Sequence, residues 1–196
     1  MTYSTVSPPS SVGEESSLAT ATSVGCVLAA LGSVAYISLN GMEPREAYSH
    51  PVGIVGGLVA TAGVVLLALV LVGWRSALPG WAVRTAAAGL VFVAANTWFF
   101  GIGIVAVADH TSDAVFETIG TSGWMWGMYF PRMLLCLVAF VTMGVAGWRQ
   151  RSIPRPAAVI LVLAGVLSIW PPYPPGLILA SLAFFLIARS GMAAKQ

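Results

Sequence analysis

Long apolar runs alternate with short polar breaks along this chain. Most runs are long enough to cross a bilayer, whose hydrocarbon core of about 30 Å needs roughly 20 apolar residues in a helix. The uncharged runs lie between Glu15 and Glu43, His50 and Arg75, Arg84 and Asp109, Arg132 and Arg149, and Arg155 and Arg189. The pattern predicts six membrane-spanning helices, at roughly 18–40, 51–73, 81–108, 125–148, 155–170 and 174–189.

Turn-forming residues separate these helices. Breaks are expected at Asn40-Gly41, at Pro79-Gly80, between Gly120 and Gly123, and at Ile153-Pro154. The last break, "PPYPP" at 171–175, cannot continue a helix, because each proline lacks an N–H and clashes with the preceding turn. The fifth and sixth helices are only about 24 Å long at 1.5 Å per residue. They either span a locally thinned bilayer or form a re-entrant hairpin, and the sequence leaves both open.

The composition agrees with this pattern. Hydrophobic residues make up 58% of the 196 positions and charged residues 8%, against about 25% charged residues in an ordinary soluble domain. The chain is therefore expected to be all-α, a polytopic integral membrane protein with the lipid bilayer as its partner and no nucleic-acid partner. A flexible tail at 1–17, a transmembrane domain at 18–190 and a short tail at 191–196 are expected.

The cations predict the orientation of the bundle. With six crossings, one side receives most of the Lys and Arg residues, and the other receives only Arg45 and, near a helix end, Arg132. Cytoplasmic loops of membrane proteins are enriched in Lys and Arg, so both termini are expected in the cytoplasm of a cell-membrane protein. The residues on the cationic side are Arg75, Arg84, Arg149, Arg151, Arg155, Arg189 and Lys195.

Small residues recur at helical spacing in the first two predicted helices. Small side chains let the backbones of two helices approach closely, which favours association inside lipid. The sequence therefore predicts that these two helices pack as an antiparallel pair. The stripes are Gly25, Ala29, Gly32 and Tyr36 in the first helix, and Gly53, Gly56, Ala60 and Gly63 in the second.

The segment "ADHTSDAVFE", residues 108–117, gathers several of the few ionisable residues on the outer side. From Ser112 onward it resembles the start of a short helix, with Ser112 as N-cap and an acid in the first turn. Val115, Phe116 and Ile119 fall on one face, opposite Asp113 and Glu117. This predicts a short amphipathic helix on the membrane surface between the third and fourth spanning helices.

Five residues of the outer side are types that hold divalent metal ions: His50, Asp109, His110, Asp113 and Glu117. Their spacing matches no metal-binding motif, so solvated side chains are the favoured interpretation. No cofactor is expected, and a divalent metal at these residues is the alternative.

Two polar residues lie inside the predicted spans. Arg132 is about two turns into the fourth helix and is expected somewhat below the outer surface, paired with Asp109, Asp113 or Glu117. Asn96 is expected to make a hydrogen bond to a neighbouring helix. The middle of the bundle is otherwise expected to hold no ionisable side chain, and the polar chemistry is expected at the outer rim.

These features favour a non-enzymatic accessory or scaffold component, which binds another membrane protein or a second copy of itself through its lipid-embedded faces. The alternative is a small transporter or membrane enzyme that uses the outer group His50, Asp109, His110 and Arg132 for a cation or a polar substrate. A cavity lined by these four residues would favour the alternative.

Overall fold

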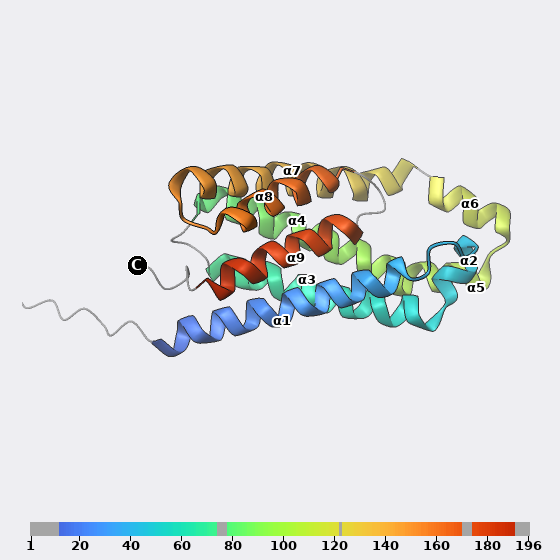
Figure 1. Ribbon diagram of the computed structural model, residues 1–196. Coiled ribbons are helices and arrows are strands. Elements are labelled where there is room, and N and C mark those ends of the chain that lie inside the picture. The colour runs from blue at the N-terminus through green and yellow to red at the C-terminus, as the bar shows by residue number, and fades with distance from the viewer. Residues whose placement is uncertain (1–11, 74–77, 122, 170–173, 191–196) are drawn as a thin grey trace, which may run out of the picture.

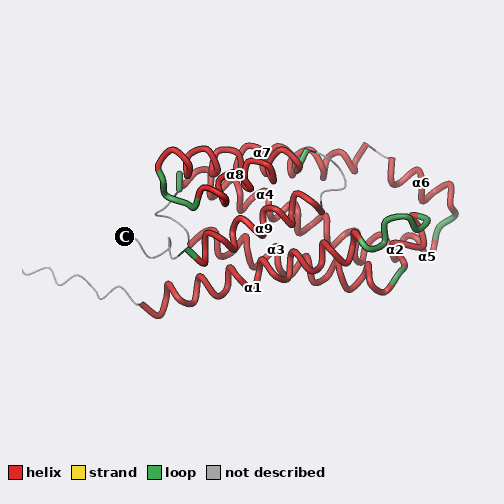
Figure 2. The backbone as a smooth tube through the Cα atoms, viewed as in Figure 1, coloured by secondary structure: helices red, strands yellow, loops and turns green. Residues whose placement is uncertain are grey.

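The described residues of the computed structural model, 12–73, 78–121, 123–169 and 174–190, form an all-helical bundle (Figures 1 and 2). Residues 1–11 of the tail predicted at 1–17, the predicted tail at 191–196, Arg75, and residues 171–173 of the last break lie outside this part of the chain. The elements are α1 (Val12–Ile37), α2 (Pro44–Ser49), α3 (Pro51–Gly73), α4 (Gly80–Trp98), the π-helical stretch η1 (Phe99–Gly103), α5 (Ile104–His110), α6 (Asp113–Thr121), α7 (Gly123–Gln150), α8 (Arg155–Leu167) and α9 (Pro174–Arg189).

Four helical stretches among the described residues are long and apolar enough to cross a membrane. They are Ser17–Ile37, Pro51–Gly73, Gly80–Val107 and Tyr129–Gln150, and each matches one of the first four predicted spans. The third stretch includes α4, η1 and the start of α5, which follow one another without a turn. The sequence prediction of apolar helices is therefore confirmed for these four.

Several helix boundaries differ from the predictions. The first helix runs over Val12–Ile37 and not over 18–40, and α8 ends at Leu167 and not at residue 170. The short helix α2 was not predicted, although Pro44 stands in its first turn and Glu46 follows it, a combination that favours helix starts.

The long helices and the α8–α9 hairpin form a closed ring. Each packs against its neighbour in the order α1, α3, α4, α7, α8, α9, and α9 returns to α1. All these helices contribute to the core, where Phe140 of α7 meets Phe184 of α9 edge to face, with ring centroids 5.8 Å apart.

The α1–α3 pair is the closest contact of the ring and confirms the predicted pairing. A Cβ atom added at Gly32 would overlap the backbones of Gly56 and Ala60, and one added at Gly63 would overlap the backbone of Ala29. The two helices therefore touch through backbone atoms over several turns. Such contact is possible only because the facing side chains are small.

The ring has two chemically different ends (Figure 1). We call the end formed by α2, α5 and α6 the acidic end, because Glu43, Glu46 and Asp113 lie there. We call the opposite end the arginine end, because Arg84, Arg149, Arg151, Arg155 and Arg189 lie there, together with the first residues of α1. Residues 12 and 190 are thus at the same end, and His50 and His110 are both at the other, as the six-helix topology predicts.

The turn between α7 and α8 is held by a Schellman motif. The amide of Ser152 donates to the carbonyl of Gly147 (3.1 Å), and the amide of Arg151 donates to the carbonyl of Trp148 (3.3 Å). In this motif the residue after the C-cap adopts a left-handed conformation, which favours glycine. Here that residue is Arg151, with φ = 53°.

Replacing Arg151 with glycine is expected to raise the free energy of unfolding by about 1 kcal/mol, because the left-handed conformation strains a residue that has a Cβ atom. The measurement is reversible unfolding of the purified protein by SDS titration in mixed micelles. Arg149→Gly, two residues earlier in right-handed helix, is the control and is expected to lower stability. Lower stability in Arg151→Gly would contradict the strain argument.

Candidate functional site

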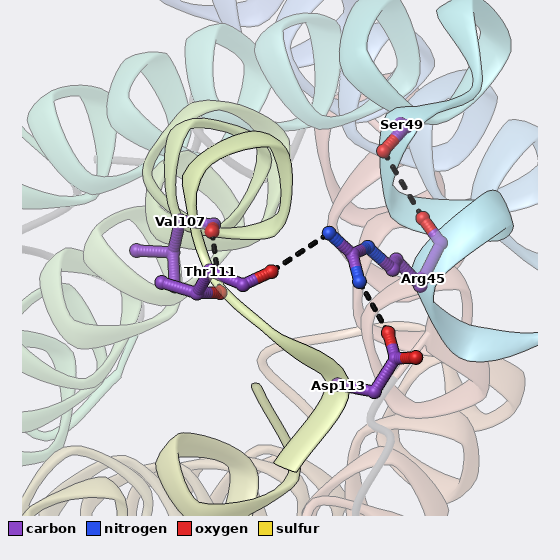
Figure 3. Close-up of polar contacts among 5 residues, drawn as sticks. All are labelled: Arg45, Ser49, Val107, Thr111 and Asp113. Carbon is purple, nitrogen blue, oxygen red and sulfur yellow. Dashed lines mark hydrogen bonds and ion pairs between the residues drawn. The ribbon is translucent and has the colours of Figure 1, made fainter. Parts of the chain in front are cut away.

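The acidic end is held together by Arg45 of α2 (Figure 3). Its guanidinium forms an ion pair with Asp113, the first residue of α6, and its second terminal nitrogen donates to the carbonyl of Thr111 (2.8 Å). The Thr111 hydroxyl in turn donates to the carbonyl of Val107 (2.7 Å). Arg45 therefore joins the α1–α3 connection to the end of α5 and the start of α6.

The exposure of this pair limits its contribution to stability. The side chain of Arg45 is 41% exposed and that of Asp113 is 88% exposed. Exposed ion pairs typically contribute about 0.2–1 kcal/mol and weaken as salt rises. The contact is suited to positioning α2 and α6 and adds little to the stability of the bundle.

Arg45→Ala is expected to lower the free energy of unfolding by about 1 kcal/mol, because it removes both the ion pair and the bond to the Thr111 carbonyl. Asp113→Asn removes only the ion pair and is expected to cost less than about 0.5 kcal/mol. Thermal unfolding in detergent at low and high salt measures both variants. Equal losses in the two variants would show that the bond to Thr111 contributes nothing.

The two histidines make local backbone contacts. The Nδ1 atom of His50 accepts from the amide of Val52 (3.3 Å), and that of His110 lies 2.9 Å from the carbonyl of Ala106. The side chains of Asp109 and Glu117 are outside the described part of the structure. Among the side chains that are described, no group of three His, Cys, Asp or Glu residues could hold a metal ion.

Arg132 is buried inside the ring of helices. It is 1% exposed and is the largest fully buried side chain among the described residues. Its guanidinium carbon lies 5.2 Å from the centre of the Tyr129 ring. Asp113, one of its three candidate partners, is paired with Arg45, and the cavity that Arg132 lines contains neither histidine. The pairing of Arg132 with Asp109 or Glu117 stays a prediction, because those two side chains lie outside the described part of the chain.

This narrow cavity lies between four helices of the ring, α4, α7, α8 and α9. Its volume is ≈ 10 Å³, about the space of one water molecule. Leu90 and Val93 of α4, Arg132, Cys136 and Phe140 of α7, Ser168 at the end of α8, and Gly176 and Leu177 of α9 line it. The end of α8 and the start of α9 thus lie at the level of Arg132. Nine residues of α7 precede Arg132, beginning with Gly123, so α7 extends about 14 Å beyond this level.

The end of α8 provides an electrostatic reason for a cation at this place. Ser168 is the C-cap of α8, and the C-terminal end of a helix carries a partial negative charge of about half an elementary unit. A guanidinium in the same small cavity is favoured by this charge, and the face of Tyr129 adds a cation–π contact. Arg132 of α7 therefore lies in one cavity with the C-terminal end of α8 and the first turn of α9.

The prediction for Asn96 is wrong. Its amide nitrogen donates to the carbonyl of Phe92 in its own helix (3.0 Å), and its buried Oδ1 has no hydrogen-bond partner among the described residues. The polar contact between α3 and α4 is made one residue later, where the hydroxyls of Thr61 and Thr97 lie 2.7 Å apart. Asn96 points elsewhere because adjacent helix positions are rotated by about 100°.

The residues that follow Arg132 along α7 indicate its burial, although its charge suggests an exposed position. Cys136, Ala139 and Met143 follow it at helical spacing and are all buried, whereas Leu134, Val138 and Val145 on the other side of α7 are exposed. Taking this buried stripe as the inner face of the helix would have placed Arg132 inside the ring.

Comparisons of the chain with protein-family models, curated proteins and solved structures found no match.

Proposed function

We propose that this chain is a multi-pass integral protein of the cell membrane that acts as a non-enzymatic accessory or scaffold component. Four helices span the bilayer, and α8 and α9 form a re-entrant hairpin that enters from the cytoplasmic side. The arginine end faces the cytoplasm, in agreement with the excess of cations there. The helix α6 lies on the opposite membrane surface with its apolar face toward lipid.

The lengths of the helices support the re-entrant hairpin. The 13 residues of α8 and the 16 of α9 correspond to roughly 20 and 24 Å, short of the bilayer core of about 30 Å. Ser168 at the end of α8 and Leu177 near the start of α9 are buried, and both line the cavity of Arg132. Helix ends are tolerated at membrane depth where they are buried in protein.

The observation that carries the proposed function is an apolar groove on the outside of the α1–α3 pair. Its volume is ≈ 450 Å³, whereas the cavity beside Arg132 has ≈ 10 Å³. The groove is lined by Leu31, Gly32, Ala35, Pro51, Val52, Val55, Gly56 and Val59. Small residues recessed between exposed Leu31 and Val55 allow a further helix to approach closely. We assign this groove to a spanning helix of a partner membrane protein.

Site-specific crosslinking tests this assignment. A photoreactive residue at Val55 is expected to form a discrete protein adduct in native membranes, whereas one at Leu69 is not. Both side chains are on α3 and exposed, at 58% and 68%, but only Val55 lines the groove. An adduct of twice the chain mass would identify a homo-oligomer and not an accessory component. Absence of any protein adduct at Val55 would overturn the proposal.

Cysteine labelling tests the topology. Ser112→Cys is expected to react with a membrane-impermeant maleimide added to intact cells. Ile169→Cys, next to the end of α8, is expected to remain unlabelled from either side of the membrane. The native Cys26 and Cys136 are buried and give little background. Labelling of Ser112→Cys only after lysis would reverse the orientation, and labelling of Ile169→Cys from outside would make α8 and α9 complete spans.

A second candidate function is binding or transport of a small anion at Arg132. Two observations favour it: a fully buried cation beside the C-terminal end of the short helix α8, and the π-helical stretch η1 in the neighbouring helix. Ionisable residues at membrane depth and π-helical segments both concentrate at functional sites. Chloride or nitrate would then raise the thermal stability of the wild type but not that of Arg132→Met. Equal shifts in both proteins would exclude this function.

A further inference from the structure

A second groove opens on the outside of the ring, between α7 and α8. Its volume is ≈ 350 Å³. Gly144 and Ala158 form its floor, where a Cβ atom added at Gly144 would lie 2.6 Å from the carbonyl oxygen of Ala158. Val145, Val159 and Leu163 form its exposed walls. From Arg155 to Leu163 the helix rises by about 12 Å, a length that an extended acyl chain can follow.

The groove ends among three arginines. Trp148 and Arg149 line its last part at the arginine end. The guanidinium of Arg155 lies 5.7 Å from the centre of the Trp148 ring, which keeps this cation beside the groove. Arg151 stands in the turn between the two helices. One end of an otherwise apolar groove is therefore strongly cationic.

The positions of two of these arginines are unfavourable for the fold alone. Arg155 is the first residue of α8, where the positive end of the helix dipole repels a cation. Arg151 adopts the left-handed conformation that favours glycine. The same dipole, together with the arginines, attracts an anionic group. The local charge is therefore complementary to a phosphate.

We propose that this groove binds one anionic glycerophospholipid of the cytoplasmic leaflet. An acyl chain lies between Val145, Val159 and Leu163, and the phosphate lies among Arg149, Arg151 and Arg155. The site is separate from the α1–α3 groove assigned to a partner helix, so each assignment can fail without the other.

Native mass spectrometry of the purified protein tests the site. The protein is mixed with equal amounts of phosphatidylglycerol and phosphatidylcholine that carry the same acyl chains, and the ratio of the two bound lipids is measured. Each arginine near an anionic headgroup contributes a preference of roughly fivefold. Arg149→Gln and Arg155→Gln are each expected to lower the ratio about fivefold, and Arg151→Gly is expected to lower it while stabilising the fold. The protein is purified before the lipids are added, so any effect of these substitutions on membrane insertion does not change the measured ratio.

Arg189→Gln is the matched control for Arg155→Gln, since Arg189 also lies over an aromatic ring, that of Phe185, at the same end but outside the groove. Its ratio is expected to equal that of the wild type. An equal fall of the lipid ratio in Arg189→Gln would show that any arginine at this end attracts the anionic lipid, and it would overturn the site. An unchanged ratio in Arg149→Gln and Arg155→Gln would overturn it as well.

A second measurement tests whether the acyl chain lies in the groove. The bulky group is added after folding, so the result does not depend on the folding of a bulky variant. Val159→Cys is purified and then alkylated with a bulky aromatic maleimide, which fills the groove in folded protein. The modified protein is expected to lose its bound phosphatidylglycerol, whereas Leu69→Cys treated in the same way keeps it. Undiminished binding after alkylation of Val159→Cys would show that the groove does not hold the lipid.

Discussion

Replacing Gly63 with leucine is expected to lower the free energy of unfolding by at least about 3 kcal/mol, or to prevent folding. A Cβ atom at this position would overlap the backbone of Ala29 and lie 2.7 Å from the carbonyl oxygen of Gly25. Overpacking costs about 1–3 kcal/mol where side chains can adjust, and here the obstacle is backbone. SDS titration in mixed micelles measures the loss.

Gly127→Leu is the matched control, because Gly127 is also helical but, among the described residues, no atom outside the backbone of its own helix lies within 4 Å of an added Cβ. It is expected to be neutral or slightly stabilising, since glycine is a poor helix former by about 1 kcal/mol relative to alanine. A loss in Gly127→Leu as large as that in Gly63→Leu would mean that the α1–α3 contact is not the cause.

Replacing Arg132 with glutamate is expected to cost about 3–5 kcal/mol, the usual penalty of a buried charge without compensation. The reason is the change of sign beside the negative end of α8 and the face of Tyr129, both of which favour a cation. Arg132→Met, which is similar in volume, is expected to change stability by less than about 1.5 kcal/mol, because well-packed apolar replacements of buried charges are often neutral.

Reversible unfolding in SDS separates these two variants. Exposed Arg84→Glu at the arginine end is the control for charge reversal and is expected to change stability by less than about 0.5 kcal/mol. If Arg132→Met lost as much as Arg132→Glu, the role of Arg132 would depend on specific hydrogen bonds. Stabilisation of Arg132 by the end of α8 and by Tyr129 would then be the wrong explanation for its burial.

The ion pair between Arg45 and Asp113 at the acidic end could not be predicted from the sequence. All three acids near residue 113 were candidate partners for Arg132, and Asp113 instead pairs with Arg45. The pair depends on α2, a helix of six residues, which is too short for an apolar periodicity to be recognised in the sequence. It also depends on how α5 ends at Thr111.

Apolar periodicity and small residues were sufficient to identify the four long helices and the α1–α3 pair. A helix satisfies its own backbone hydrogen bonds, so its position follows from local apolar content. A stripe of Gly and Ala likewise marks a close contact wherever the partner helix lies. These features are local, and each can be read from one stretch of the chain.

The packing of α8 and α9 and the environment of Arg132 depended on the tertiary structure. Which side of α7 faces inward is decided by α4, α8 and α9 together, and these are separated from Arg132 by tens of residues. The charge of Arg132 predicted an acidic partner, and the closed ring adds a second favourable environment, the negative end of a short helix. Electrostatic compensation of this kind comes from packing between distant segments, and no local pattern encodes it.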